Sequence, residues 1–310
     1  MAALTLLEIA KTMQNTQQAA VVGTYASSYQ PITAMPLKAA PQGVYQWYLE
    51  NQLPYSTGGV RNLNGSWTRT AGSNSPKSET IRIYGGSFQI DRQLAKINPS
   101  AVEDQKKKQI EADARQLTID MFEGAGGTSL YGIENVLDND IDFANQTSLV
   151  GTSTTAAVLT TDALDILIGM IDKQPGNTFI YCTDAVGRMI RKLSRGSVTS
   201  SNSNYNVNYT PEQFGYFAGM YDDVPVVVLK DGAGNDMLTK TRATSSDGCS
   251  VYAVTYGDSA FTGFQVNPME VIPLRDDTVY DFFDYEWPVG IAVQSKRCIA
   301  RLRWVKNATS

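Results

Sequence analysis

Residues Pro99–Gly124 decide the fold of this chain, and they run PSAVEDQKKKQIEADARQLTIDMFEG. The stretch predicts one long helix, because Ser100 and Glu103 have the spacing of a capping box that satisfies backbone N–H groups at a helix start. Opposite charges then recur four residues apart, which supports a helix. These pairs are Glu103–Lys107, Asp104–Lys108 and Glu111–Arg115. Gly124 is placed to end the helix in a left-handed conformation.

The two halves of this expected helix differ in polarity. At 1.5 Å per residue the helix is roughly 36 Å long. Its first half is almost free of apolar residues, whereas its second half contains Ile110, Leu117, Ile119, Met121 and Phe122. We therefore expect one end to be anchored in a core and the other to run over a surface or against a neighbouring chain. A long spine of this kind is more typical of a building block than of a catalyst.

Composition limits the classes of function. The 310 residues are 42% hydrophobic, which is enough for a real core in one large or two modest domains. The net charge of −5 argues against wrapping nucleic acid, which requires concentrated Lys and Arg. Lys106–Lys108 is the one basic run, and carboxylates on the same helix can match it.

The chain contains no histidine, which removes Ser-His-Asp and Cys-His catalysis and histidine metal sites. Its three cysteines, Cys182, Cys249 and Cys298, are far apart and are expected to be reduced, buried thiols in a cytoplasmic environment. No signal peptide is expected, because Glu8 and Lys11 interrupt the first apolar run. No stretch of eighteen apolar residues is present, so no membrane partner is expected.

The first part of the chain predicts a helix followed by an extended arm. Residues 4–22 have the spacing of an amphipathic helix. Pro31, Pro36 and Pro41 then recur every five residues, which opposes a helix and favours an extended path. Residues 44–49 are aromatic enough to dock this arm on another surface.

Residues 55–92 predict a long polar hairpin. The run Gly65–Thr70 leads into the turn-rich segment Ala71–Pro76, and Lys77–Phe88 returns as the second strand. An isolated hairpin is marginal in water, so this one is expected to be supported by a partner chain. The alternative is a flexible surface loop.

The middle of the chain predicts an α/β region. Thr161 is expected to cap a helix that runs through Asp172, and Asp184 to cap a second one. Asn177–Cys182 and Val224–Leu229 have the composition of buried strands, and Ser194–Asn208 that of a mobile loop.

The remainder predicts strands. The expected strands are Val251–Tyr256, Phe261–Val266, Glu270–Pro273, Val279–Tyr285 and Val289–Trp304. In the last of these, apolar residues at 300, 302 and 304 alternate with Arg301 and Arg303, which predicts a half-buried strand.

Two motifs resemble ligand loops. Asp138–Asp142 imitates the start of a calcium loop, but Phe143 replaces the required glycine and Leu149 the required glutamate. This excludes an EF-hand and leaves only some other cation site open. Gly124–Thr128 is glycine-rich but lacks the lysine of a phosphate loop, so a helix end and a turn explain it. We expect no metal site and no cofactor.

An acidic cluster is the best enzymatic candidate, and it consists of Asp276, Asp277, Asp281, Asp284 and Glu286. On one strand, Asp284 and Glu286 share a face at roughly 6.5–7 Å. This separation is near the one that an inverting glycosidase places between its acid and base. Exposed acidic residues near Arg275 at a subunit contact explain the cluster more simply, so we expect no catalytic residue.

The order of these parts resembles the major capsid protein of tailed bacteriophages, the Johnson fold. Leu130–Val136 is similar to the L-x-G-I turn that follows the spine helix in many members. Gly290–Val293 and Cys298–Leu302 are similar to their final strands. The resemblance implies an α+β fold with an N-terminal arm, an extended β-hairpin loop, a spine helix, an α/β axial domain and a β-rich peripheral domain.

The resemblance also implies domain boundaries. The N-terminal arm is expected at 1–54 and the extended loop at 55–91. The first part of the peripheral domain, with its spine helix at 100–123, is expected at 92–154. The axial domain is expected at 155–250, and residues 251–310 are expected to complete both domains.

The function that the resemblance implies is that of a virion protein. Copies would form hexamers and pentamers of an icosahedral shell around double-stranded DNA, assembled in the bacterial cytoplasm. Portal, scaffold and decoration proteins are the other implied partners, and the DNA would be contacted non-specifically. Some members crosslink a lysine to an asparagine; Lys77 is a possible donor, although an exposed lysine explains it better.

Three alternatives remain at this point. An encapsulin-type nanocompartment shares the fold and encloses cargo enzymes. A glycoside hydrolase would be a monomer and would depend on Asp284 and Glu286. An adhesive or tail-associated β protein would form trimers or rings.

Overall fold

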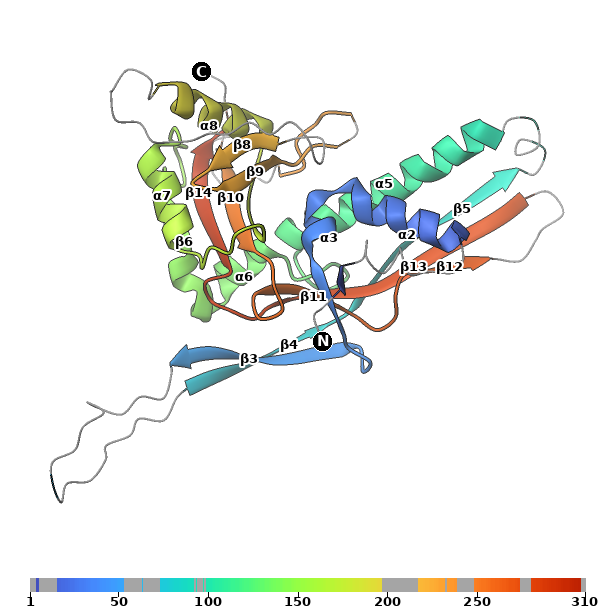
Figure 1. The fold of residues 1–310 in the computed structure, drawn as a ribbon, viewed down its shortest axis with the longest axis horizontal. Helices are drawn as coiled ribbons and strands as arrows, with labels where there is room; N and C mark the ends of the chain where they lie inside the picture. The colour runs from blue at the N-terminus through green and yellow to red at the C-terminus, as the bar shows by residue number, and fades with distance from the viewer. Residues whose placement is uncertain are drawn as a thin grey trace.

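The computed structural model describes residues 4–5, 16–52, 63, 73–91, 93, 97, 99–196, 217–231, 233–238, 248–273 and 280–307. These residues form a mixed α+β fold with two six-stranded sheets and a two-stranded hairpin. The hairpin projects from the body on one side, and a long helix lies across one of the sheets (Figure 1).

The expected spine helix is confirmed as α5, Pro99–Glu123. Gly124 does not end it in a left-handed conformation, because positive φ angles fall on Gly126 (79°) and Gly127 (74°). Close approach explains the glycine at 124 instead, since a Cβ there would lie 2.3 Å from the carbonyl oxygen of Leu130. The helix is polar in its first half and buries Ile110, Leu117, Met121 and Phe122 in its second, as expected.

The N-terminal region differs from the expected helix over 4–22. Leu4–Thr5 is strand β1, and helix α2 comes later, at Thr16–Ser28. A short helix α3, Gln30–Ala34, tolerates Pro31 because proline fits the first turn, where its missing N–H is not needed. Strand β2, Pro36–Ala39, is extended as predicted.

The hairpin has a different first strand from the predicted one. Strand β3, Val44–Gln52, pairs with β4, Ser73–Thr80, whereas the expected partner Gly65–Thr70 lies outside the described residues. The expected return strand is also divided at Ile81. Strand β5, Arg82–Asp91, leaves the hairpin and pairs with β13 in the first sheet.

The first sheet has the order β1-β2-β11-β13-β12, with β5 also paired to β13. Its later strands are β11 (Phe261–Gln265), β12 (Glu270–Pro273) and β13 (Tyr280–Val293). The break predicted after Tyr285 is wrong, because β13 continues through Pro288 as a single strand of 14 residues. Helices α2 and α5 lie beside one another along this sheet (Figure 1).

The second sheet has the order β6-β14-β10-β7-β9-β8. Its strands are β6 (Thr147–Leu149), β7 (Thr178–Cys182), β8 (Phe217–Tyr221), β9 (Val224–Val228), β10 (Gly248–Thr255) and β14 (Ile299–Lys306). The predicted strand Val289–Trp304 is therefore two strands in two sheets. Residues 294–298 form the turn between them.

Four short helical segments surround this sheet: α6 (Ile133–Asn139), the 3-10 helix η1 (Ile141–Gln146), α7 (Thr161–Gly169) and α8 (Asp184–Gly196). The cap of α7 is Thr160, whose hydroxyl accepts a hydrogen bond from Ala163 N at 3.3 Å, rather than Thr161. This helix also ends at Gly169, before the predicted Asp172. Of the predicted loop 194–208, residues 194–196 belong to α8 and the rest lies outside the described residues.

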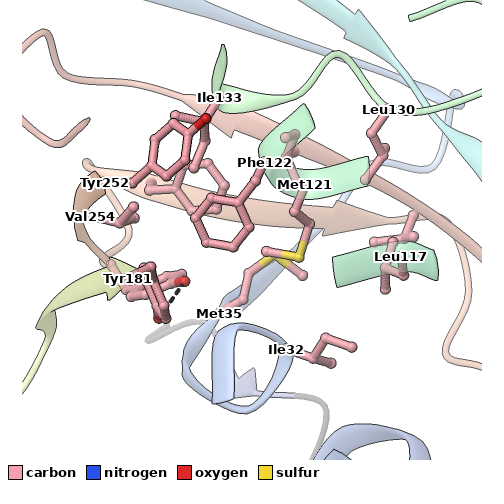
Figure 2. Packing of buried hydrophobic residues seen from close by; sticks show 14 of the residues in the cluster. Ile32, Met35, Leu117, Met121, Phe122, Leu130, Ile133, Tyr181, Tyr252 and Val254 are labelled. Carbon is pink, nitrogen blue, oxygen red and sulfur yellow. Dashed lines mark hydrogen bonds between the residues drawn. The ribbon is translucent and has the colours of Figure 1, made fainter. Parts of the chain in front are cut away.

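One core joins the parts (Figure 2). Ile32 and Met35 from the N-terminal segment pack with Met121 and Phe122 from the end of α5, and Tyr181 and Tyr252 of the second sheet complete the cluster. A second core lies between that sheet and helices α7 and α8. The spine helix is thus fixed at its C-terminal end by side chains from both sheets.

Candidate functional site

The base of the hairpin is fixed to the body by aromatic packing. Tyr45 stacks on Trp47 at 5.8 Å and on Phe264 at 5.2 Å between ring centroids. The indole N–H of Trp47 donates to the Val293 carbonyl oxygen at 2.9 Å. Gly290 makes room for this stack, since a Cβ there would lie 2.2 Å from the Phe264 ring. These contacts hold the inner face of β3 and leave its outer face free.

The outer face of the hairpin is exposed and carries two large apolar side chains among polar ones. Along β3 the side chains alternate, so that Val44 is 41% and Tyr48 74% exposed, whereas Leu49 is buried. Leu63, which lies between β3 and β4 in the sequence, is 96% exposed. Large apolar side chains exposed on one face of a two-stranded element are typical of a surface that another chain covers.

Lys77 of β4 forms an ionic latch with η1 and the residue before it. Its Nζ lies 2.7 Å from Asp140 and 2.8 Å from Asp142, and Lys296 adds a contact to Asp142 at 3.4 Å. The Lys77 side chain is only 23% exposed, so the prediction of an ordinary exposed lysine is wrong. The aspartates of the calcium-like run Asp138–Asp142 therefore form ion pairs with basic side chains of the same chain.

The latch shifts the pKa of Lys77 and the pKa of Asp142. Burial opposes the charge of Lys77, but the hydrogen bonds that Lys77 donates to Asp140 and Asp142 together outweigh it and raise the pKa of Lys77. The hydrogen bond from Lys77 lowers the pKa of Asp142. Because the folded-state pKa of Asp142 is depressed, its stabilisation is complete above the ordinary aspartate value of about 3.9 and is lost as the pH falls below it.

We expect Lys77→Met to loosen the hairpin without unfolding the body. Amides of Ser73–Thr80 should exchange faster than in the parent at neutral pH, as measured by hydrogen exchange corrected for intrinsic rates. The parent should approach the variant once the pH falls below about 3.9 and through the depressed pKa of Asp142, because that carboxylate then loses its charge. Lys107→Met, on the exposed half of α5, is the matched control. Unchanged exchange in β4 of Lys77→Met would contradict the latch.

Two tyrosines clasp the spine helix to the first sheet. Tyr84 of β5 donates to Asp120 Oδ2 at 2.7 Å, and its hydroxyl accepts from Leu130 N at 3.1 Å. Tyr285 of β13 donates to Asp113. The two aspartates stand two helical turns apart, so they share one face of α5. The two hydrogen bonds therefore fix both the position of α5 on the sheet and its rotation about its own axis.

We expect Tyr285→Phe to lower the free energy of unfolding by about 1.5–3 kcal/mol, because the variant removes a hydrogen bond to a carboxylate and keeps the ring. Urea titration of the unassembled protein would measure it. Tyr48→Phe removes a hydroxyl from a residue that is 74% exposed and should have almost no effect. Equal effects of the two variants would contradict the clasp.

A buried ion network joins α6 to β14. Arg301 is 1% exposed and lies 2.5 Å from Asp138 and 3.5 Å from Glu134, which is also 1% exposed. Arg303 contacts Asp138 at 3.4 Å. The prediction of a half-buried strand is wrong here, because Ala300 and Leu302 on one face and Arg301 on the other are all buried. Alternation alone does not distinguish an exposed arginine from one that is paired in a core.

The proposed pair of the acidic cluster lies on a single strand. Asp284 and Glu286 lie on one face of β13, opposite the buried Tyr285 and Trp287, and Glu286 is exposed beside its cross-strand partner Glu270. Asp276 and Asp277 lie outside the described residues. A cavity of about 100 Å³ lies elsewhere, under the hairpin, and it is lined by Trp47, Lys77, Tyr131, Val136, Phe143 and Ile291 among others.

The cysteines are buried and free. Burial raises the pKa of Cys249 and of Cys298 to about 12, and it also raises that of Cys182, which disfavours a reactive thiolate. Within the described ranges, no three potential ligand side chains are grouped so as to hold a metal ion. None of the helices in the described part of the chain has the length and apolar character needed to span a bilayer.

Comparisons with solved structures find the same architecture in shell proteins. The chain is similar to the capsid of a native GTA particle (TM-score 0.61, 12% identity, 91% of this chain and 90% of the other). It is similar to the SrpI encapsulin of Synechococcus elongatus PCC 7942 (0.60, 12%, 90% and 88%). It is also similar to the capsid of cyanophage A-1(L) (0.58, 11%, 87% and 90%). No family model and no curated protein sequence matches the chain.

Proposed function

We propose that this chain, which has the Johnson fold of phage capsid and encapsulin subunits, is the major capsid subunit of a tailed bacteriophage. Copies would assemble into hexamers and pentamers of an icosahedral shell that encloses double-stranded DNA. The observation that carries the proposal is the hairpin of β3 and β4, which projects from the body (Figure 1) and exposes Val44 and Tyr48 on its outer face.

The physical case for assembly rests on this hairpin. A two-stranded hairpin is marginal in water, and the body covers only the inner face of this one. On the outer face Tyr48 stays 74% and Val44 41% exposed in this chain, so burial against a neighbouring copy would stabilise them. Many contacts of this size, repeated around a closed shell, supply the stability that one contact lacks.

We further propose a division into domains in which each domain contains the strands of one sheet. The extended loop then spans Val44–Thr80, nearer the N-terminus than the 55–91 expected from sequence. The first sheet with α2 and α5 would be the peripheral domain. The second sheet with α7 and α8 would be the axial domain, and β14 would bring the end of the described chain back into it.

The role proposed here is structural and requires no catalytic residue, metal or cofactor. The subunit would reside in the virion capsid after assembly in the host cytoplasm. Its net charge of −5 suits a wall that contacts packaged DNA only non-specifically. Portal, scaffold and decoration proteins are the further partners that this role implies.

Negative-stain electron microscopy and light scattering of the purified protein test the proposal. We expect shells, tubes or capsomer rings of megadalton mass, and nuclease-protected DNA in particles taken from infected cells. Particles that hold a protein cargo and no DNA would favour the encapsulin alternative. A monomer of 33.9 kDa at every concentration, alone and with co-expressed scaffold, would overturn the proposal.

A further inference from the structure

The cavity of about 100 Å³ under the hairpin has walls from two parts of the molecule. Trp47 and Glu79 line it from the hairpin, and Val136, Phe143 and Val293 line it from the body. An occupant would therefore touch both parts and hold the hairpin against the body.

The cavity has the size and lining of a site for a small organic group. Val136, Phe143 and Val293 are each no more than 8% exposed, so its floor is apolar. An apolar cavity of roughly 150 Å³ binds benzene, so about 100 Å³ has room for about four non-hydrogen atoms. An ordered water needs two to four polar partners, and an apolar floor supplies none.

The side-chain donors around the cavity are already engaged within the chain. The indole N–H of Trp47 donates to the Val293 carbonyl oxygen at 2.9 Å. The hydroxyl of Tyr131 donates to the Asn135 carbonyl oxygen at 3.3 Å. The ammonium of Lys77 is held by the two aspartates of the latch. A ligand that enters this cavity must therefore bring its own donors.

Glu79 is the acceptor that such a ligand would meet. Its side chain lies on the inner face of β4, like that of Lys77, and it accepts a hydrogen bond from the backbone N–H of Thr80. The Arg82 guanidinium favours the Glu79 charge, but its own hydrogen bonds go to the carbonyl oxygens of Thr80 and Ile81. Burial raises the pKa of Glu79. Because a carboxylate accepts about four hydrogen bonds, this one has capacity for more.

We propose that the cavity binds a primary ammonium group on a short alkyl chain, with the ammonium on Glu79 and the chain on Val136 and Phe143. An ammonium has three donors and no acceptor, and its hydrogen bonds to a carboxylate are charge-assisted. The charge of Lys77 does not oppose it, since the latch neutralises that lysine. A free amine and a lysine side chain of another protein share this chemistry. The site requires only the folded chain, so it does not depend on the shell function.

Ligand-detected saturation-transfer NMR on the full chain tests the site. The probes are propylamine, 1-propanol and propionate, which differ in charge at nearly equal size, at millimolar concentration because ligands this small bind weakly. We expect propylamine to bind at least tenfold more tightly than 1-propanol, and propionate not to bind. Nα-acetyl-lysine methylamide separates the two sources. Tighter binding than propylamine would assign the site to a lysine of another chain, and weaker binding to a free amine.

Three variants make the result specific. Glu79→Gln keeps the shape of the side chain, and should weaken propylamine at least tenfold and leave 1-propanol unchanged. Val136→Ile adds a methyl group to the cavity floor and should weaken both probes. Glu270→Gln, which changes an exposed carboxylate of β12, is the matched control and should bind like the parent. Circular dichroism confirms that each variant is folded.

Hydrogen exchange gives an independent measurement. Propylamine should slow amide exchange of Ser73–Thr80 in the parent and in Glu270→Gln, but not in Glu79→Gln, because the occupant joins β4 to the body. Equal binding of propylamine and 1-propanol would show an apolar cavity without recognition of a cation and overturn the proposal. Binding of neither probe would show a cavity for water alone and also overturn it. In both cases the capsid role would stand, whereas a parent that binds propylamine and never assembles would lose only that role.

Discussion

Replacing residues 53–72 with Asn-Gly should leave a folded protein that no longer forms shells. Gln52 and Ser73 are directly paired across β3 and β4, so a two-residue turn can join the strands without changing their register. The base of the hairpin, with Lys77 and Trp47, stays intact. We expect the assembled fraction to fall below detection by electron microscopy, because under the proposed function the residues beyond Gln52 and Ser73 belong to the extended loop that contacts a neighbouring copy.

The replacement is designed to separate assembly from folding. A wider deletion of 60–85, which lies within the hairpin predicted at 55–92, would also remove β4 and the first residues of β5, and Arg82–Gly85 pair with β13. That deletion should therefore unfold part of the first sheet. The short replacement should change the melting temperature by no more than about 2–4 °C, equivalent to roughly 1 kcal/mol or less. Normal shells from the short variant would refute the role of the hairpin.

Arg301→Ala should lower the free energy of unfolding by about 3–5 kcal/mol, because it leaves Glu134 buried without its guanidinium partner. Both side chains are 1% exposed, so water cannot replace the lost contact. Urea unfolding of the unassembled subunit measures the change. Such a loss is a large share of a typical domain stability of 5–15 kcal/mol.

Two variants make this result specific. Arg303→Ala removes a residue that is 23% exposed and contacts Asp138 at 3.4 Å, so it should cost about 1 kcal/mol or less. Arg301→Met combined with Glu134→Leu removes both charges and should recover much of the loss, since an apolar pair avoids the desolvation penalty. A loss below about 1 kcal/mol in Arg301→Ala would show that the network contributes little.

Elements with strong local signals were predictable from the sequence. The spine helix, β7, β9 and β12 have capping, periodicity or β-branched composition within their own residues. The helix of Thr161–Gly169 was found as well, with its cap misplaced by one residue. These signals act over a few residues, so a single sequence contains them.

Features that depend on distant residues were not predictable. The first hairpin strand was misplaced because β3 follows a proline-rich arm whose composition gives no register. Strand β13 was divided because Pro288 ordinarily weakens a strand, although here Ile83 is its cross-strand partner in β5.

The candidate sites show the same limit. Lys77 has its partner Asp140 63 residues away, and Arg301 has Glu134 167 residues away. Only the folded chain shows that these charges are paired. A sequence pattern gives the charges and their alternation, and burial decides whether they are solvated or structural.

The place of β14 between β6 and β10 has a consequence for synthesis on the ribosome. Arg301 and Thr147, on neighbouring strands β14 and β6, stand 154 residues apart. At 5–20 residues per second, roughly 8–30 s pass between translation of the two strands. Throughout that interval β6 lacks its partner strand, and β10, once residue 255 is made, waits for the same strand. Open strand edges of this kind invite wrong pairing. A chain cut short before residue 299 cannot complete its second sheet.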